Sequence, residues 1–211
     1  ALTEITLPKS LKTLGAYAFQ GCTKLRSINY PLSWSSAEYG IFAGCSNLTS
    51  IVVPEGVVTI PAYAFDAATY LEEITLPSTL TTIGENAFYN CPGISEFEFP
   101  ESLTTINRYA FQGCTGIESI VLPDSVKSIG EYAFKGCSYL ENVKMPSTYY
   151  TIGEGAFVET QYTGTEDDFV ITEDGILTQY RGTDTEIVVP EGVTQIGTTF
   201  SENKTITSII L

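Results

Sequence analysis

Apolar and polar residues along this chain follow one pattern that returns every 23 residues. Ile117–Tyr139 (IESIVLPDSVKSIGEYAFKGCSY) is one complete unit, and Leu2–Lys24 (LTEITLPKSLKTLGAYAFQGCTK) repeats it. Each unit opens with L-x-x-I-x-L-P, whose alternation is typical of a half-buried β-strand. Seven in-phase strands begin at Leu2, Leu25, Leu48, Leu71, Ile94, Ile117 and Leu140. Because no unit can bury its apolar face alone, the pattern predicts stacked units with one continuous core.

The remainder of each unit predicts a turn, a second short strand and a compact corner. Proline cannot donate a backbone hydrogen bond, so a column of prolines marks where strand pairing ends. These prolines are Pro8, Pro31, Pro54, Pro77, Pro100, Pro123, Pro146 and Pro190. An apolar pair such as Val126 and Ile129 then predicts a brief strand on an opposite wall. The next pair, as in Ala133-Phe134, predicts one helical or 3₁₀ turn whose phenylalanine stacks inside the coil.

Two segments depart from this pattern. Residues 33–40 carry the only tryptophan, Trp34, which we expect on an altered outer wall. Further along, the apolar runs at 169–172 and 176–180 flank Glu173-Asp174-Gly175, which indicates a β-hairpin.

We therefore expect residues 1–211 to form one domain of about nine rungs, one for each repeat. Its regular repeats cover residues 2–158, a degenerate hairpin rung covers 159–183, and the repeats resume over 184–211.

The complete motif, L-x-x-I-x-L-P-x-S-[LV]-x-x-I-G-x-x-A-F-x-G-C, resembles the BspA-like leucine-rich repeat family. The similarity is strong over Leu2–Val158 and looser over Glu186–Leu211. The resemblance implies a β-rich leucine-rich repeat solenoid, a horseshoe-like, right-handed coil with short helical turns. It also implies a bacterial cell-surface or secreted protein in which the repeats are one module of a longer polypeptide. Such modules bind other proteins, host matrix or neighbouring cells, and the family shares no catalytic motif.

Composition and charge narrow the choice of partner. A hydrophobic content of 43% with 17% charged residues indicates a folded chain. The net charge of −15 argues against nucleic acid and anionic membrane surfaces, because no basic stripe could neutralise phosphates. No apolar run is long enough to span a bilayer, and this stretch contains no signal peptide. The resemblance implies an extracellular or cell-surface location, and we expect a monomer without a cofactor.

The cysteines occupy one column of the repeat and do not form a metal-ligand motif. They are Cys22, Cys45, Cys91, Cys114 and Cys137, and Ala68 fills the gap in the column. An alanine in register indicates that a small buried apolar residue is required, so we expect buried free thiols, although a disulfide between adjacent rungs stays possible. The chain has no histidine, which excludes Ser-His-Asp and Cys-His catalysis, and we expect no enzyme.

The best candidate site is the face formed by the third and fifth residues of each strand, which should point outward. Glu72, Glu73, Glu96 and Glu98 cluster there on two neighbouring rungs, and Glu118 lies at the rim. Like charges about 5 Å apart repel by roughly 1 kcal/mol even in water, so stability alone does not favour this arrangement. It is either a patch for a basic partner or a solvated acidic face that prevents aggregation.

A weaker candidate is a calcium site of Asp167, Asp168 and Asp174 around the expected hairpin, since carboxylates are hard oxygen ligands. Their spacing does not match the twelve-residue calcium loop, and a polar hairpin tip explains them equally well.

The sequence thus predicts a non-catalytic protein-binding or adhesion module that uses the strand face and the variable loops. One alternative is a structural spacer that presents other domains. Another is glycan binding through exposed aromatic residues such as Trp34, Tyr30 and Tyr39.

Overall fold

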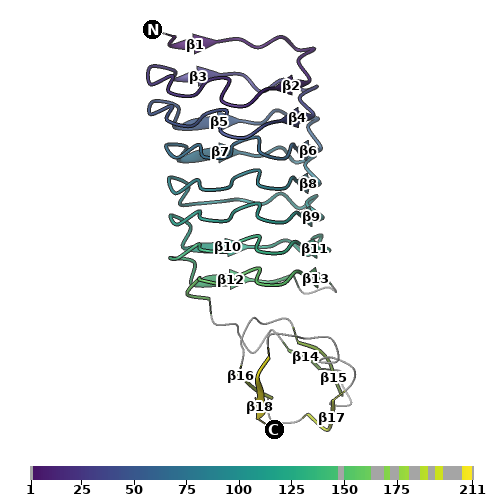
Figure 1. The fold of residues 1–211 in the computed structure, drawn as a ribbon. Coiled ribbons are helices and arrows are strands. Elements are labelled where there is room, and N and C mark those ends of the chain that lie inside the picture. Colours follow the sequence, from purple (N-terminus) through teal and green to yellow (C-terminus); the bar gives the residue numbers. More distant parts are fainter. Residues whose placement is uncertain are drawn as a thin grey trace. The chain divides into compact units, whose positions relative to one another are not determined.

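The computed structural model describes residues 2–146, 150–162, 169–171, 176–180, 186–189, 193–196 and 206–210. The chain divides into two compact units, Ala1–Gln161 and Tyr162–Leu211. The first unit is a solenoid of about seven turns, built from parallel strands on two walls (Figure 1). The predicted repeat solenoid is confirmed. The expected nine rungs are wrong, because the residues after Gln161 gather in a second compact unit. The assignment of residues 1–211 to one domain stays a prediction.

Two sets of short strands form the walls of the first unit. The first wall contains β1 (Glu4–Ile5), β3 (Ser27–Ile28), β5 (Ser50–Val52), β7 (Glu73–Thr75), β10 (Ser119–Val121) and β12 (Asn142–Lys144). The second wall contains β2 (Thr13–Leu14), β4 (Ser36–Ala37), β6 (Thr59–Ile60), β8 (Thr82–Ile83), β9 (Thr105–Ile106), β11 (Ser128–Ile129) and β13 (Thr151–Ile152). Paired residues lie 23 positions apart, as in Ser50 with Glu73, so each repeat forms one rung. Counted from the N-terminus, rung four starts at Leu71, rung five at Ile94 and rung six at Ile117.

The predicted helical or 3₁₀ turns are wrong, since no helix occurs in the part of the chain that the structure describes. The corners are turns in which alternate amides bond in different directions. Ala110 and Gln112 donate within the turn, to the carbonyls of Asn107 and Tyr109. Phe111 donates to the next rung, to the carbonyl of Ala133 at 2.7 Å. A 3₁₀ helix needs consecutive internal bonds, and this alternation removes every second one.

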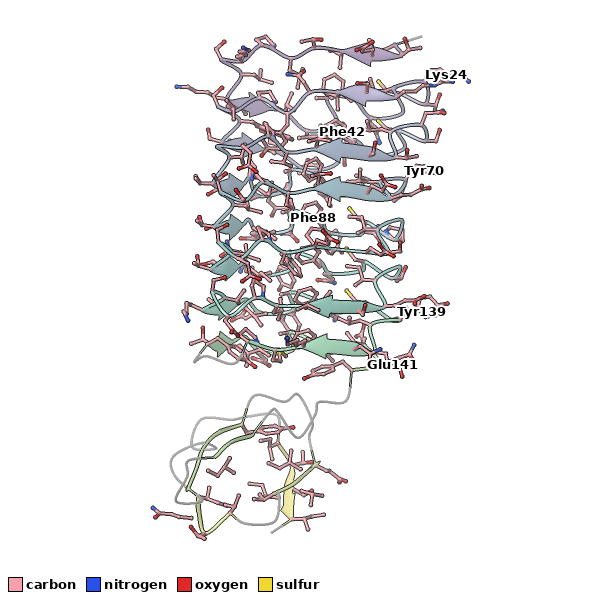
Figure 2. The ribbon with its side chains drawn as sticks, turned by 180° about the vertical axis from the view of Figure 1, so that it is seen from behind. Lys24, Phe42, Tyr70, Phe88, Tyr139 and Glu141 are labelled. Atoms are coloured by element: carbon pink, nitrogen blue, oxygen red, sulfur yellow. The ribbon has the colours of Figure 1, made fainter. Side chains whose placement is uncertain are left out.

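A column of phenylalanines fills the space between the walls, as predicted. Figure 2 shows the side chains of Phe42 and Phe88 inside the coil. Ring centroids of successive members lie 5.1–5.2 Å apart from Phe65 to Phe157, and their planes differ by 1–18°. The column comprises Phe19, Phe42, Phe65, Phe88, Phe111, Phe134 and Phe157. Its ring spacing is close to the roughly 4.8 Å between paired strands, so ring stacking and strand pairing reinforce each other.

The cysteine column lies beside this stack, and its five thiols are free, as expected. Cys91, Cys114 and Cys137 are fully buried, and each thiol donates to the carbonyl of the phenylalanine 26 residues earlier at 3.0–3.1 Å. Burial raises the pKa of Cys45, Cys114 and Cys137 above the ordinary value of a thiol. These side chains therefore act as small core residues.

The second unit contains the hairpin that the sequence indicates. β14 (Phe169–Ile171) pairs antiparallel with β15 (Ile176–Tyr180), which pairs in parallel with β17 (Gln195–Ile196). β16 (Glu186–Val188) pairs in parallel with β18 (Ser208–Ile210). The expected hairpin tip, Glu173-Asp174-Gly175, lies outside the described residues.

Replacing a central ring of the phenylalanine column tests its importance. Phe111→Ala should lower the free energy of unfolding by about 3–5 kcal/mol, because it leaves a cavity between Phe88 and Phe134. Urea denaturation followed by circular dichroism measures this loss. Tyr139→Ala is the control, since that side chain is 61% exposed and its loss should cost no more than about 0.5 kcal/mol. Equal effects of the two substitutions would contradict the role of the column.

Thiol titration at about pH 8 tests the cysteine column. The native chain should react slowly at Cys91, Cys114 and Cys137, because all three thiols are buried and burial also raises the pKa of Cys114 and Cys137. The half-buried Cys22 should react first. All five thiols should react in denaturant, and fewer than five would reveal a disulfide.

Candidate functional site

The first wall presents two exposed columns of side chains, as the alternation predicts. The residue between each pair points inward, so that Ile51 is 5% exposed while its neighbour Val52 is 65% exposed. The exposed pairs are Glu4 and Thr6, Ser27 and Asn29, Ser50 and Val52, Glu73 and Thr75, Glu96 and Glu98, Ser119 and Val121, and Asn142 and Lys144. These positions vary from charged to apolar between rungs, because their exposed side chains do not have to pack in the core.

The acidic side chains gather along a groove between rungs four and five. The groove has a volume of about 910 Å³, and Glu72, Glu73, Glu96 and Glu98 line it together with Glu55. Glu55 accepts hydrogen bonds from the amide and hydroxyl of Ser78, at 2.9 and 3.0 Å. The ion pairs found among the described residues join Arg108 to Glu85 and Lys135 to Glu159, and none of the groove glutamates takes part in them.

Four of the five predicted glutamates therefore share one site, and Glu118 does not. Its exposed side chain lies in rung six outside the groove, and its carbonyl accepts the amides of Glu141 and Asn142 in the next rung.

The groove exists because the first wall is interrupted at rung five. The second wall runs through this region without a break, since β6, β8, β9, β11 and β13 form one five-stranded sheet. The first wall instead consists of the separate pairs β1–β3, β5–β7 and β10–β12. Within the described residues 2–146, no backbone hydrogen bond joins residues 95–99 to rung four or rung six. A second groove of about 380 Å³ lies on the other side of this segment, toward rung six.

Two aromatic residues account for the interruption. Phe97 and Phe99 stand in rung five where rung four has Ile74 and Leu76. The Phe97 ring packs edge-on against Phe88 and Phe111, with centroids at 5.2 and 4.7 Å, and Phe99 packs edge-on against Phe111 at 5.7 Å. These rings are larger than the aliphatic side chains they replace, and accommodating them displaces the backbone of residues 95–99 from strand pairing.

A second break supports this explanation. The first wall also lacks pairing between β3 and β5, and the rung that contains β3 carries Tyr30 where rungs one, three, four and six have leucine or valine. The Tyr30 ring packs against Trp34 and Phe65. In both places a large ring in the inward column accompanies an open seam.

Comparison with known proteins places this architecture in a family. The model of the BspA-type leucine-rich repeat region, which contains six copies, matches residues 1–118 and 104–211. The chain belongs to the BspA-type leucine-rich repeat family. None of the curated proteins is significantly similar to it in sequence.

Solved structures of bacterial proteins share the fold. A leucine-rich repeat protein of T. pallidum is 29% identical, with a TM-score of 0.63 over 74% of this chain and 76% of that one. A leucine-rich repeat protein of Eubacterium ventriosum is 26% identical, with a TM-score of 0.58 over 78% of this chain and 45% of its own. One from Bacteroides ovatus shows the fold at 24% identity, with a TM-score of 0.54 over 98% of this chain and 56% of its own. The chain thus spans about half the length of the latter two proteins.

The position of Trp34 corrects one expectation for this BspA-type chain. Trp34 and Tyr30 are 5% and 6% exposed, so neither lies on an outer surface. The indole nitrogen of Trp34 donates to the carbonyl of Ser36 at 2.8 Å, which satisfies its polar group inside the core. Of the three aromatic residues suggested for glycan binding, only Tyr39 is exposed, and its ring packs edge-on against Tyr17 at 5.1 Å.

The structure does not describe the residues of the expected calcium site. Asp167, Asp168 and Asp174 lie outside the described residues. Among the residues that are described, no group of three potential metal ligands comes together. Nor does any helix there have the length and apolar character needed to cross a membrane.

The interruption of the first wall was missed by sequence reasoning, although a signal was present. Phe97-Glu98-Phe99 breaks the I-x-L pattern of the repeat, and its alternation alone still predicts an ordinary strand. The acidic side chains lie along the open seam, and the backbone beside them is unpaired.

Amide hydrogen exchange tests whether the seam is open in solution. The amides of Glu96 and Glu98 should show protection factors below about 10, because they have no bonding partner in neighbouring rungs. Asn107 is a control in the same rung, since its amide donates to the carbonyl of Ile83 at 3.0 Å and should be protected at least about 10³-fold. Similar protection at all three amides would show a closed first wall.

Proposed function

We propose that this chain is a non-catalytic protein-binding module of a bacterial surface or secreted protein, and that it adheres to its partner through the first wall. The observation that carries this proposal is the acidic groove between rungs four and five, which is lined by Glu72, Glu73, Glu96 and Glu98. Membership of the BspA-type family and the bacterial origin of the similar structures support the setting.

A stacked solenoid suits this task because its surface is formed before binding. The first wall rests on the phenylalanine column, whose members are buried from Phe42 to Phe157, so little conformational entropy is lost on association. Several carboxylates on one face attract a basic partner and accelerate the encounter. They also repel acidic proteins, which makes the face selective.

The chemistry of the side chains supports the proposal of a non-catalytic role. The chain contains no histidine that could activate a nucleophile. The buried Cys114 and Cys137 have raised pKa values and donate to carbonyls, so they are not activated thiols. The groove is open to solvent and offers no enclosed site that would exclude water from a reaction.

A structural spacer is the second candidate. The continuous phenylalanine column and the five-stranded second wall favour a stiff rod that holds other domains apart. Such a rod needs no specific ligand, whereas a binding module must show saturable association.

Charge reversal in the groove tests the binding function. Glu73→Lys/Glu96→Lys/Glu98→Lys should weaken binding to immobilised matrix proteins or intact cells by at least about tenfold, because it replaces attraction of a basic surface by repulsion. Surface plasmon resonance and flow cytometry measure the association. The melting temperature should change little, since all three side chains are exposed.

The matched control is Glu4→Lys/Glu131→Lys/Glu154→Lys, which changes the net charge equally at exposed positions outside the groove. Equal loss in both triple variants would assign binding to overall charge. A complete lack of saturable association by the unmodified chain would favour the spacer.

A further inference from the structure

We propose that the interrupted first wall accepts an extended, lysine- or arginine-rich segment of a partner protein as an added β-strand along the free edge of β7. This inference rests on the proposed binding function and specifies how the partner is held. It concerns the backbone of the groove as well as its charge.

The first step is the direction of the backbone groups in β7. On its upstream side, the carbonyl of Thr75 accepts the amide of Val53 at 2.9 Å, as part of the parallel pairing with β5. Successive residues of a strand direct their backbone groups to opposite sides. The amides and carbonyls of Ile74 and Leu76 therefore face downstream, and both residues line the groove.

The second step is the absence of a partner on that side. In the described range 2–146, neither Ile74 nor Leu76 forms a backbone hydrogen bond with residues 95–99. The 95–99 segment itself has no backbone partner in rung four or rung six. A strand edge with unpaired donors and acceptors is the template to which an extended chain adds.

The volume of the groove is that of a ligand-binding cleft. Its volume of about 910 Å³ lies in the range of ligand-binding clefts. It is bounded by β7 on one side and by Ser95, Glu96, Glu98 and Phe99 on the other. The paired rungs β5–β7 and β10–β12 are closed by hydrogen bonds and leave no corresponding opening.

Charge complementarity identifies the occupant. Five glutamates line the groove, and no lysine or arginine does. Side chains of an added strand alternate between faces, so basic residues at every second position would lie beside Glu73 on one side and Glu96 or Glu98 on the other. A second copy of this chain is a poor occupant, because its own edge is equally acidic and its net charge is −15.

Phe97 and Phe99 account for the opening, so the contribution of the free strand edge can be tested separately from that of the acidic charge. Phe97→Ile/Phe99→Leu restores the residues of rung four and should let residues 95–99 pair with β7, while every glutamate remains. Glu96→Gln/Glu98→Gln keeps the opening and removes two charges.

The test uses the probe heptapeptide Lys-Val-Lys-Val-Lys-Val-Lys, labelled for fluorescence anisotropy. Its control is the same peptide N-methylated on the five inner residues, which keeps the charges and removes amide donors. The unmodified chain should bind the probe at least about tenfold more tightly than the N-methylated control. Phe97→Ile/Phe99→Leu should lose at least about tenfold in affinity, and Glu96→Gln/Glu98→Gln should weaken binding and reduce its salt dependence.

A structural readout accompanies the titration. Hydrogen exchange at the amides of Ile74 and Leu76 should slow when the probe is bound, while exchange at Asn107 should not change. Circular dichroism verifies that each variant is folded. Should Phe97→Ile/Phe99→Leu fail to fold, the comparison of the two peptides on the unmodified chain still decides the question.

Equal affinity for the N-methylated peptide, equal binding by a folded Phe97→Ile/Phe99→Leu, or no binding of the probe would each overturn strand addition. If intact partner proteins still bind and depend on the groove glutamates, the proposed function stands and only its mechanism fails. If intact proteins also show no saturable association, both proposals fail.

Discussion

The stacking of one phenylalanine per rung is the constraint on which the first unit depends. Ring centroids 5.1–5.2 Å apart from Phe65 to Phe157 repeat at nearly the distance that strand pairing requires, so one translation satisfies the core and the backbone together. The corners of most rungs strengthen this link, because alternate amides, such as that of Phe111, donate to carbonyls of the next rung. A rung therefore has no independent structure, and its neighbours complete both its core and its hydrogen bonding.

Rung five shows what happens when these two demands conflict. Two aliphatic positions of the inward column are filled by Phe97 and Phe99, and the structure keeps the rings packed while it gives up the strand pairing beside them. The magnitudes explain this outcome. Burial of a large apolar side chain is worth about 1.5–3 kcal/mol, whereas a hydrogen bond that water can replace contributes only about 0.5–1.5 kcal/mol. The groove thus results from core packing, and acidic side chains line both of its sides.

Periodicity explains which features the sequence could predict. The 23-residue spacing determines the strand columns, the outward positions of Glu73 and Glu96, the phenylalanine stack and the free cysteines, since each depends only on position within the repeat. The corners were mistaken for helical turns because apolar spacing does not reveal whether a backbone amide donates within its own turn or to a carbonyl of the next rung. Trp34 was placed outside because composition alone does not show that its ring fills a space next to Phe65. The open seam depends on how the rings of Phe97 and Phe99 compare in size with the side chains at the same positions of neighbouring rungs. The pattern of one repeat does not contain this comparison.

The alternation of exposed and buried residues in the first wall also bears on how such a surface changes over evolutionary time. Val52 and Val121 are 65% and 59% exposed at positions that elsewhere carry threonine, asparagine, glutamate or lysine, while the neighbouring Ile51 and Ile120 are buried. Substitutions in the exposed columns leave the stack intact, so new specificities can arise one rung at a time without passing through unstable intermediates. Duplication of a repeat would lengthen the surface by one rung and copy the core that supports it.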